Sequence, residues 1–319
     1  MIVAEVMPLP VPPGYRPPDD LDIVALSALP DQEGWLAEHG NGIGVLVTHA
    51  GHGAPRELLQ RLTGLKLVAH FGAGLDLLDL DLLRERGVAL TYTADLLTDD
   101  VADLALMLML GGLRRIVECD RFIRAGAWGR TAPPLGRSAA GRRVGVYGLG
   151  RIGHAFARRA AACGCTIGYH GRSAQQRCDY AYFSSLHDLA QWSDVLVAAV
   201  PGAPETTGAI NGDVLQALGP DGLLVNVARG AVVDESALID ALAQGRIAAA
   251  ALDVFDKEPA IDPRFLALSN VTLTPHIGSL TSDTRGAMAD HVYGNVRRHL
   301  TGAPLIGRFF HGETTNGHG

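Results

Sequence analysis

The sequence predicts an α/β protein with two parallel-sheet domains separated by a cleft, on three observations. The chain has 319 residues, which is more than one hydrophobic core usually holds. Apolar strand-like runs alternate with helical patterns, and this alternation is typical of parallel sheets. The alternation gives way to a long helical stretch after residue 98, and it resumes beyond a loop rich in proline and glycine at Ala127–Arg137.

The first domain is expected to contain five short strands separated by helices and loops. Its helical patterns are "RELLQRL", Arg56–Leu62, and "LLDLDLLRERG", Leu77–Gly87, in which apolar residues recur with the period of a helix. The strand candidates are short apolar runs. They are Ile2–Val6, Ile23–Leu26, Gly44–Thr48, Leu67–His70 and Val88–Tyr92.

A long helix is expected from Asp99 to about Ala125. Thr98 or Asp99 is its predicted N-cap, because side-chain oxygens of these residue types accept hydrogen bonds from the free N–H groups of a helix start. Gly111 and Gly112 lower the helix propensity, so a break near them is left open.

The second half of the chain repeats the alternation of strands and helices. Helices are expected at Arg151–Cys163 and Asp234–Gly245, and a last amphipathic helix at about Ser282–Leu300. The strand candidates are again apolar runs bounded by turn formers. They are Arg142–Gly148, Thr166–His170, Asp194–Val200, Gly222–Ala228, Ala249–Val254 and Val271–Pro275.

These two series of elements set the expected domain boundaries. Residues 99–281 form the predicted cofactor-binding domain, and residues 1–98 and 282–319 form the other domain. The chain would then cross twice between the domains, which makes a hinge with a ligand cleft beside it. The terminal segment Gly312–Gly319 is expected to fray.

Composition predicts a globular protein without nucleic-acid, membrane or metal partners. Charged residues make up 19% of the chain and the net charge of −7 is dispersed, which disfavours binding to nucleic acid or to an anionic membrane. The N-terminus lacks the charged and apolar regions of a signal peptide. No metal-binding spacing relates Cys119, Cys163, Cys165 and Cys178. We therefore expect buried, reduced thiols and a cytoplasmic location.

The segment "GVYGLGRIGHAF" carries a glycine pattern that binds dinucleotide phosphates. Gly148, Gly150 and Gly153 have the G-x-G-x-x-G spacing, between an apolar strand and an alanine-rich helix. The first glycine permits the tight turn, the second lets a pyrophosphate approach the backbone, and the third lets helix and strand pack closely. The N-terminus of the helix adds N–H groups and partial positive charge. A glycine turn that serves packing alone is the alternative.

The next strand, Thr166–His170, ends without the acidic residue that usually binds the 2′-hydroxyl of the adenosine ribose. Gly171, Arg172 and Ser173 occupy that place. Arg172 offers a charge-assisted pair to a 2′-phosphate, and Ser173 adds a hydroxyl. The sequence therefore predicts that NADPH is preferred and that NADH is possible. The alternative is that Arg172 is a solvated surface residue.

Arg229, Glu258 and His276 each follow a strand of the second half, and parallel strands place ligands beyond their carboxyl ends. Arg229 suits a substrate carboxylate and carbonyl through its two donors. His276 suits proton transfer to the carbonyl oxygen, and Glu258 would stabilise the protonated imidazole. Together they predict reduction of a 2-oxo acid by a nicotinamide cofactor. Taken singly, they also fit an ion-pair partner, a solvated acid and a buried histidine.

These segments resemble the D-isomer-specific 2-hydroxyacid dehydrogenase family, from about Gly44 to Leu300. The matching stretches are "GLGRIG", "LLVNVARGAVVDESAL", "AALDVFDKEP", "LTPHIGS", "LTDDVADLAL" and "HFGAGLDLLDL". The family implies a flavodoxin-like substrate domain, a Rossmann cofactor domain, and a homodimer formed through the Rossmann domain. It gives the three polar residues the roles stated above.

The resemblance also implies further site residues. Ala73 and Gly74 would offer backbone N–H groups to the substrate carboxylate, which Arg229 and His276 would also contact. The cofactor would contact the phosphate loop, the turn after the following strand, and the strand ends on the nicotinamide side. The expected cofactor residues are Gly148, Leu149, Gly150, Arg151, Ile152, Gly153, Gly171, Arg172, Ser173, Val200, Pro201, Thr206, Val227, Ala228, Arg229, Asp253, His276 and Ser279.

Within the family, "LTDDVADLAL", "ECDRFIRAGAW" and "GYHGRS" are most similar to NADPH-dependent glyoxylate/hydroxypyruvate reductases. Plant hydroxyphenylpyruvate reductases share much of this pattern, and corepressors that sense dinucleotides on the same scaffold are a non-catalytic alternative. "AAVPGAPET" departs from the usual family sequence on the nicotinamide side. The substrate is expected to be a small 2-oxo or 2-hydroxy acid. Two readings of Trp128 stay open, a contact with the partner subunit's site and packing within its own loop.

Overall fold

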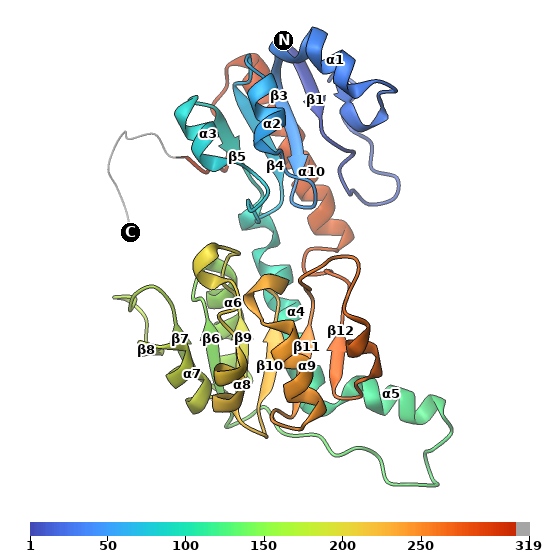
Figure 1. Ribbon diagram of the computed structural model, residues 1–319, viewed down its shortest axis with the longest axis vertical. Helices are drawn as coiled ribbons and strands as arrows, with labels where there is room; N and C mark the ends of the chain where they lie inside the picture. The colour runs from blue at the N-terminus through green and yellow to red at the C-terminus, as the bar shows by residue number, and fades with distance from the viewer. Residues whose placement is uncertain (311–319) are drawn as a thin grey trace. The chain divides into compact units, whose positions relative to one another are not determined.

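The computed structural model describes residues 1–310, and its internal contacts divide the chain into two units. Unit 1 comprises Met1–Leu97 and the chain from Ser279 onward, and unit 2 comprises Thr98–Gly278. Gly312–Gly319, which the sequence predicts to fray, lies outside the described residues. Figure 1 labels the helices and strands of both units.

Unit 1 is built on a sheet of five strands in the order β2-β1-β3-β4-β5, and every neighbouring pair is parallel. This is the flavodoxin-like strand order. The buried faces explain the apolar runs of the sequence, since both sides of a parallel sheet are covered. The strands are β1 (Ile2–Glu5), β2 (Ile23–Ala25), β3 (Ile43–His49), β4 (Leu67–Phe71) and β5 (Ala89–Thr91).

Helices cover both faces of the sheet in unit 1. One face carries three short helices, and the other carries the long α10 (Figure 1). Leucines of the short helices pack on the sheet in one core that includes Leu36, Leu59 and Leu83. Met288 and Val292 of α10 are buried as well. The helices are α1 (Gln32–His39), α2 (Arg56–Arg61), α3 (Leu80–Glu85) and α10 (Ser282–Thr301).

Unit 2 is built on a sheet of seven parallel strands in the order β12-β11-β10-β9-β6-β7-β8. This is the Rossmann order with one added strand, and the order reverses between β6 and β9. The predicted class, α/β with two parallel sheets, is thereby confirmed. The strands are β6 (Arg143–Tyr147), β7 (Thr166–His170), β8 (Ala181–Phe183), β9 (Val195–Ala198), β10 (Leu223–Asn226), β11 (Ala249–Leu252) and β12 (Val271–Leu273).

The sheet of unit 2 also lies between two layers of helices (Figure 1). Leu189, Leu215 and Leu238 belong to the core on one face, and they come from α7, α8 and α9. α4 and α6 pack on the other face, where Gly112 lies against Leu223. The bounds are α4 (Ala94–Arg114), α5 (Ile116–Arg124), α6 (Arg151–Ala162), α7 (Leu186–Trp192), α8 (Gly212–Leu218) and α9 (Glu235–Ala243).

The long helix differs from its prediction at both ends. α4 begins at Ala94, so neither Thr98 nor Asp99 is its N-cap, because the buried apolar stripe already includes Ala94 and Leu97. The helix passes through its two glycines unbroken and ends at Arg114. The break falls instead at Arg115, whose φ of 52° lies in the left-handed region and separates α5 from α4.

The cysteine expectation was wrong for most of the thiols. Cys165 is buried, whereas Cys119, Cys163 and Cys178 are partly exposed, and all four are free. Two helices of the described residues are 18 residues or longer, and neither has the apolar length that crossing a membrane requires.

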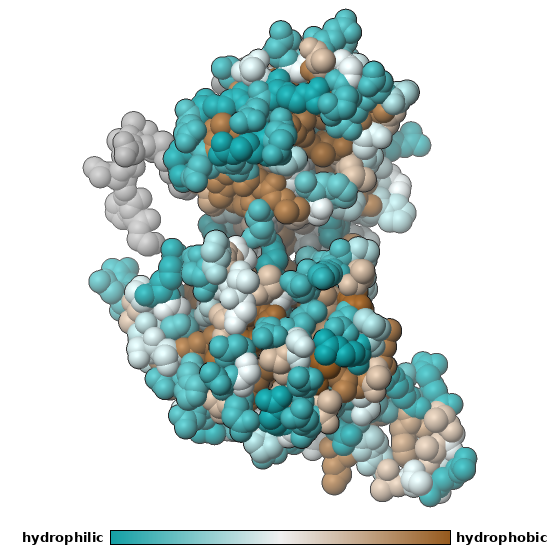
Figure 2. Space-filling view, viewed as in Figure 1, coloured by the Kyte–Doolittle hydropathy of each residue, from teal (hydrophilic) through white to brown (hydrophobic). Residues whose placement is uncertain are grey.

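Apolar side chains are exposed on α5 and in the loop that follows it. Ile116 and Ile123 on α5 are 59% and 56% exposed, and Trp128 and Leu135 in the loop are 74% and 87% exposed. Figure 2 shows apolar atoms among hydrophilic ones in this part of unit 2, at the lower right. Such a grouping is typical of a surface that another chain covers.

Candidate active site

The phosphate loop joins β6 to α6 and is built on three glycines with different roles. Gly148 has a φ of 96°, and a Cβ there would lie 2.8 Å from the Ala199 carbonyl oxygen. A Cβ on Gly153 would lie 2.0 Å from the Gly148 carbonyl oxygen, so helix and turn are in direct contact. These two positions exclude larger side chains for steric reasons within the chain itself.

Gly150 differs from the other two glycines because the space beside it is open. It is the N-cap of α6, no side chain caps the helix, and nothing lies within 4 Å of a Cβ built there. Free N–H groups at a helix start, with room for an approaching group, form a ready anion site. The loop therefore fits the diphosphate of a dinucleotide, and the contact of its glycines with a cofactor stays a prediction.

The turn after β7 lies beside the phosphate loop and is bound to it. The side-chain amide of Gln175 donates to the Leu149 carbonyl oxygen at 2.7 Å, and its backbone N–H donates to the Tyr169 hydroxyl at 2.7 Å. Arg172 and Ser173 in this turn are exposed. The turn thus has a fixed base and two exposed polar side chains, with no carboxylate where an acidic residue usually stands.

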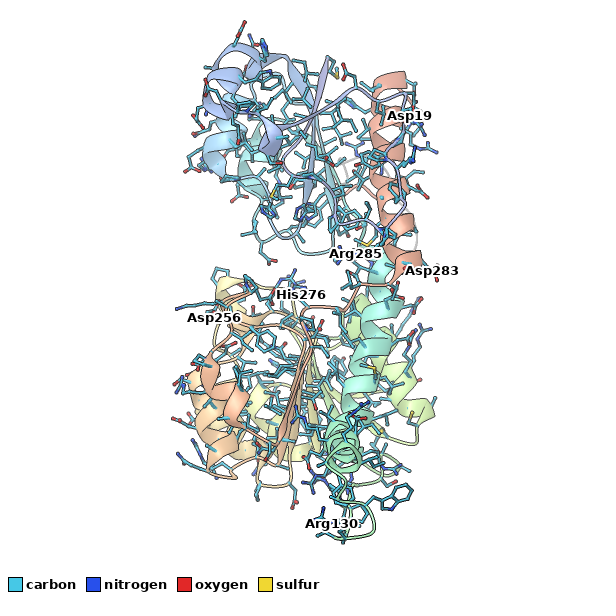
Figure 3. The ribbon with its side chains drawn as sticks, turned by 90° about the vertical axis from the view of Figure 1, so that its right-hand side faces the viewer. Asp19, Arg130, Asp256, His276, Asp283 and Arg285 are labelled. Atoms are coloured by element: carbon cyan, nitrogen blue, oxygen red, sulfur yellow. The ribbon has the colours of Figure 1, made fainter. Side chains whose placement is uncertain are left out.

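Arg229, Glu258 and His276 follow β10, β11 and β12, which are neighbours in the sheet of unit 2. Glu258 Oε2 lies 2.7 Å from His276 Nδ1. Figure 3 labels His276 at the carboxyl edge of this sheet. The structure therefore brings together the imidazole and the carboxylate that the sequence predicts as partners, and the charge of Arg229 acts on the same carboxylate.

The carboxylate of Glu258 is held in its ionised form. Burial raises its pKa, but hydrogen bonds from His276 and from the Phe255 N–H, with the charges of His276 and Arg229, outweigh that effect and leave the pKa below its usual value. The Phe255 N–H donates to Glu258 Oε1 at 3.0 Å. Both carboxylate oxygens are thus engaged, one by the backbone and one by the histidine.

The backbone of His276 has a φ of 51°, an uncommon conformation for a residue with a side chain. Asp253 holds this segment in place. Its Oδ1 accepts from the Thr274 hydroxyl at 2.6 Å and from the Ile277 N–H at 2.8 Å, and its Oδ2 accepts from the Gly278 N–H at 2.9 Å. Burial raises the pKa of Asp253 against these donors. The contacts of Asp253 within the chain position the histidine loop, and its expected cofactor contact stays a prediction.

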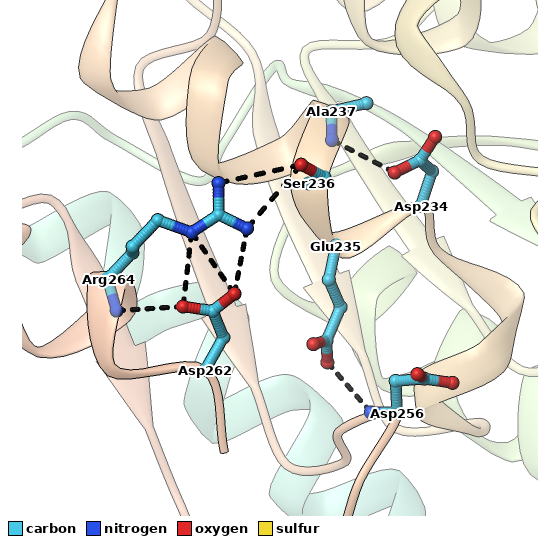
Figure 4. A network of polar contacts seen from close by, with 7 residues as sticks. All are labelled: Asp234, Glu235, Ser236, Ala237, Asp256, Asp262 and Arg264. Carbon is cyan, nitrogen blue, oxygen red and sulfur yellow. Dashed lines mark hydrogen bonds and ion pairs between the residues drawn. The ribbon is translucent and has the colours of Figure 1, made fainter.

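The loop that carries Glu258 packs against the segment after Arg229 and is hydrogen-bonded to it. A Cβ on Gly230 would lie 1.8 Å from the Phe255 carbonyl carbon, so only glycine permits this approach. Glu235 Oε1 accepts from the Asp256 N–H at 2.8 Å, as Figure 4 shows. Sequence reasoning missed Glu235, because its position at the start of α9 was a signal only for the helix.

Several other residues expected on the nicotinamide side have contacts within unit 2. Thr206 Oγ1 accepts from the Ala203 N–H at 3.0 Å and lies 2.9 Å from the Pro201 carbonyl oxygen, which fixes the turn beyond β9. The Ala228 N–H donates to Asn226 Oδ1 at 3.0 Å. Val227 is buried too. These contacts shape the strand ends, and cofactor binding by these residues stays a prediction.

In unit 1, the loop after β4 contains Ala73 and Gly74, for which substrate contacts are expected. His70 Nε2 lies 2.9 Å from the Gly74 carbonyl oxygen, so the ring donates to it. The Gly72 N–H donates to Thr93 Oγ1 at 2.8 Å. The side chains of His70 and Thr93 thus hold the backbone of this loop in place. The sequence gave no indication of this role for either residue.

One known protein family matches most of unit 2. The family described as "D-isomer specific 2-hydroxyacid dehydrogenase, NAD binding domain" matches residues 106–278. That span includes the phosphate loop and the three polar residues at the strand ends.

Individual relatives match over most of the chain. A hydroxyphenylpyruvate reductase of Plectranthus scutellarioides is 47% identical over 277 residues, which cover 87% of this chain and 88% of the relative. A glyoxylate/hydroxypyruvate reductase A of Arabidopsis thaliana is 44% identical over 277 residues, with the same coverage of both chains. The solved NADPH-dependent glyoxylate/hydroxypyruvate reductase of Sinorhizobium meliloti, in complex with NADP and malonate, is 36% identical, with a TM-score of 0.86 and 96% of each chain covered.

Proposed function

The chain belongs to the D-isomer-specific 2-hydroxyacid dehydrogenase family, and from this premise we propose that it uses NADPH to reduce small 2-oxo acids, such as glyoxylate and hydroxypyruvate, to 2-hydroxy acids. The observation that carries the proposal is the 2.7 Å contact between Glu258 and His276, with Arg229 at the neighbouring strand end. An ionised carboxylate beside an imidazole is the arrangement that general acid catalysis needs.

Each of these residues has a proposed task in the reduction. Arg229 holds the substrate carboxylate and polarises the carbonyl through its guanidinium. His276 gives the proton that the carbonyl oxygen gains, and Glu258 stabilises the protonated ring before that transfer. Ala73 and Gly74 offer backbone N–H groups to the carboxylate. When bound, the dihydronicotinamide supplies the hydride that the carbonyl carbon gains.

Preference for NADPH is supported by the turn after β7 and by the relatives. Arg172 and Ser173 are exposed where a 2′-phosphate needs donors, and no carboxylate in that turn repels it. The Sinorhizobium meliloti relative is described as NADPH-dependent and was solved with NADP. NADH remains a permitted second cofactor, because the phosphate loop fits either nucleotide.

Hydroxyphenylpyruvate is the second candidate substrate, since the Plectranthus scutellarioides relative is a hydroxyphenylpyruvate reductase. Loss of NADPH absorbance with glyoxylate, hydroxypyruvate and hydroxyphenylpyruvate tests both candidates. We expect turnover with at least one of the three acids, and faster turnover with NADPH than with NADH. Binding of NADPH without turnover of any acid would favour a dinucleotide-sensing protein.

We extend the proposal to a homodimer in the cytoplasm. The exposed apolar residues of α5 and its loop, with Trp128 the largest, are the surface that a second copy would cover. Free cysteines are typical of a reducing compartment. Light scattering during size-exclusion chromatography tests the dimer. We expect the mass of a dimer for the wild type and a larger share of monomer for Ile123→Asp. A monomeric wild type would contradict the proposal.

A further inference from the structure

Asn226 ends strand β10 three residues before Arg229, and only 1% of it is exposed. The other residues of the strand, Leu223, Leu224 and Val225, are buried and apolar. Asparagine is depleted in strands, and a buried amide is unfavourable unless it forms hydrogen bonds. The carboxamide of Asn226 is therefore explained by the contacts that it makes and not by packing.

Both ends of this carboxamide bind the backbone of the segment that carries Arg229. Oδ1 accepts from the Ala228 N–H at 3.0 Å, and Nδ2 donates to the Arg229 carbonyl oxygen at 3.0 Å. The first bond closes a turn two residues on, as asparagine side chains commonly do. The second bond fixes the peptide group that follows Arg229. One buried side chain thus binds the backbone one residue before Arg229 and at Arg229 itself.

Two further contacts restrict the backbone of Arg229. Its carbonyl oxygen also accepts from the Val232 N–H at 3.2 Å, so both lone pairs of this oxygen are engaged. The next residue, Gly230, lies so close to another loop that a Cβ on it would be 1.8 Å from the Phe255 carbonyl carbon. The hydrogen bonds of Asn226 and this close approach therefore fix the place from which the Arg229 side chain starts.

The guanidinium of Arg229 is oriented by the same segment that Asn226 holds. Its Nη1 donates to the Ala228 carbonyl oxygen at 2.7 Å, and its positive charge helps to lower the pKa of Glu258. A displacement of about one ångström in a group that positions a substrate can lower the rate by on the order of 100-fold. Loss of the carboxamide of Asn226 should therefore be felt at the guanidinium.

We propose that Asn226 is a positioning residue for substrate binding, which acts through Arg229 by fixing the backbone from which the guanidinium reaches the 2-oxo acid. The inference deepens the proposed function and rests on it for the role of Arg229. Asn226 itself touches neither the acid nor the cofactor, because it is buried in the sheet. Its substitution should therefore weaken binding of the acid much more than binding of the nucleotide.

The test compares Asn226→Ala with Asn270→Ala, a matched control from the same unit. The Asn270 amide also binds the backbone, since Nδ2 donates to the Leu242 and Ala248 carbonyl oxygens at 3.2 Å each. Asn270 directly precedes β12 and so lies at the amino edge of the sheet, whereas Arg229 follows β10 at the carboxyl edge. Loss of the Asn270 amide should lower the Tm without an effect on the site.

The probe is oxamate, an unreducible mimic of glyoxylate, titrated into the complex with NADPH. For Asn226→Ala we expect an oxamate Kd raised about tenfold or more and a glyoxylate kcat/KM lowered by a similar factor, with the NADPH Kd within about threefold. Asn226→Ser keeps an oxygen that can accept from the Ala228 N–H and lacks the amide nitrogen, so its values should lie between. This variant carries the test if Asn226→Ala does not fold. Asn270→Ala should match the wild type in all three quantities.

A double variant shows whether Asn226 acts through Arg229. In an Arg229→Ala background, Asn226→Ala should change the oxamate Kd and the glyoxylate kcat/KM by less than about twofold further, because the group that it positions is gone. An equal loss in both backgrounds would overturn the inference, as would wild-type values in Asn226→Ala and Asn226→Ser, or an equal loss in Asn270→Ala. Oxamate binding that depends on Asn226 and Arg229, without reduction of any acid, would keep the inference and overturn the proposed reaction.

Discussion

Glu258 Oε2 and His276 Nδ1 lie 2.7 Å apart, so the carboxylate occupies one of the two ring nitrogens of the histidine. A partner at Nδ1 fixes the orientation of the ring and leaves Nε2 for proton transfer. The backbone after His276 is held by the Asp253 carboxylate, through the Ile277 and Gly278 N–H groups. The loop after β12 therefore fixes the ring twice, once through its side chain and once through its backbone.

Removal of the imidazole tests the proton-transfer role. His276→Ala is expected to lower kcat by on the order of 10²–10⁴-fold, because no other group would supply the proton to the carbonyl oxygen. NADPH affinity should stay within about twofold, since the phosphate loop is untouched. Steady-state rates and a fluorescence titration with NADPH measure the two quantities. Near-normal turnover would mean that another acid gives the proton.

Neutralisation of Glu258 tests the electrostatic role of this carboxylate. Glu258→Gln removes the negative charge beside the ring of His276 but keeps an oxygen that can accept a hydrogen bond from it. We expect kcat to fall by about tenfold at neutral pH, with the KM of the 2-oxo acid within about twofold. Steady-state rates measure both quantities. An unchanged kcat would indicate that Glu258 acts only through geometry.

The same substitution has a pH-dependent effect on stability. The pKa of Glu258 in the folded protein lies below its usual value of 4.5, despite burial, because of the donors around it. A depressed pKa stabilises the fold above the pKa of the unfolded chain, and that contribution is lost as pH falls through the folded value. The difference in Tm between wild type and Glu258→Gln should therefore shrink from neutral pH to acid pH. A constant difference would contradict this linkage.

The chemistry of this site could be predicted from the sequence because its members carry it in their own side chains. Arg229, Glu258 and His276 each follow a parallel strand, and ligands of such sheets bind beyond the carboxyl ends of the strands, so their joint position indicated one site. Glu235 and Thr274 could not be predicted. Glu235 accepts a hydrogen bond from a backbone N–H of another loop, and the Thr274 hydroxyl donates to the carboxylate of Asp253. Their partners are set by loop conformations that no spacing in the sequence specifies.

Two glycines of the phosphate loop should respond differently to alanine. A Cβ on Gly153 would lie 2.0 Å from the Gly148 carbonyl oxygen, whereas a Cβ on Gly150 would meet nothing within 4 Å. We expect Gly153→Ala to lower the Tm. Gly150→Ala should keep the Tm but weaken NADPH binding by about tenfold or more, because its methyl group would occupy the space for the pyrophosphate. Equal Tm values and equal NADPH affinities would contradict both assignments.

The basic turn after β7 should set the choice between the two nucleotides. Arg172→Ala is expected to raise the KM for NADPH far more than the KM for NADH, because only NADPH carries the 2′-phosphate that the guanidinium can pair. The matched control is Arg177→Ala, another arginine a few residues further along. Equal effects of Arg172→Ala on both nucleotides, or a wild-type bias to NADH, would contradict the role.

All strands of the two sheets except β8 could be placed from the sequence within a few residues, because most of their apolar runs are buried. Shorter elements could not. α1 buries only Leu36, and β8 leaves its residues largely exposed, so neither has an apolar period to detect. The start of the long helix was misplaced for a related reason. Polar residues at 98–100 suggested a cap, whereas buried Ala94 and Leu97 continue the apolar stripe upstream.

Glu235 should act on the reaction through the loop that carries Glu258. It accepts from the Asp256 N–H at 2.8 Å, two residues before the carboxylate that holds the histidine. Burial raises the pKa of Glu235, and the nearby charges of Asp256, Asp262 and Glu258 add to the effect. A raised pKa gives stability that is present below the pKa of the unfolded chain and is lost as pH rises through the folded value. At neutral pH the ionised side chain is therefore kept at a cost in stability.

Glutamine at this position retains the acceptor and removes the charge, whereas alanine removes both. Glu235→Gln is expected to keep kcat within about twofold and to have a Tm at neutral pH no lower than the wild type. Glu235→Ala should lower kcat by about tenfold with little change in KM, because the Glu258 loop loses its anchor while the substrate donors stay in place. Ser236→Ala is the matched control, since Ser236 contacts Arg264 and not the Asp256 N–H (Figure 4). If Glu235→Gln lost activity as alanine does, the charge and not the anchor would be what the loop needs.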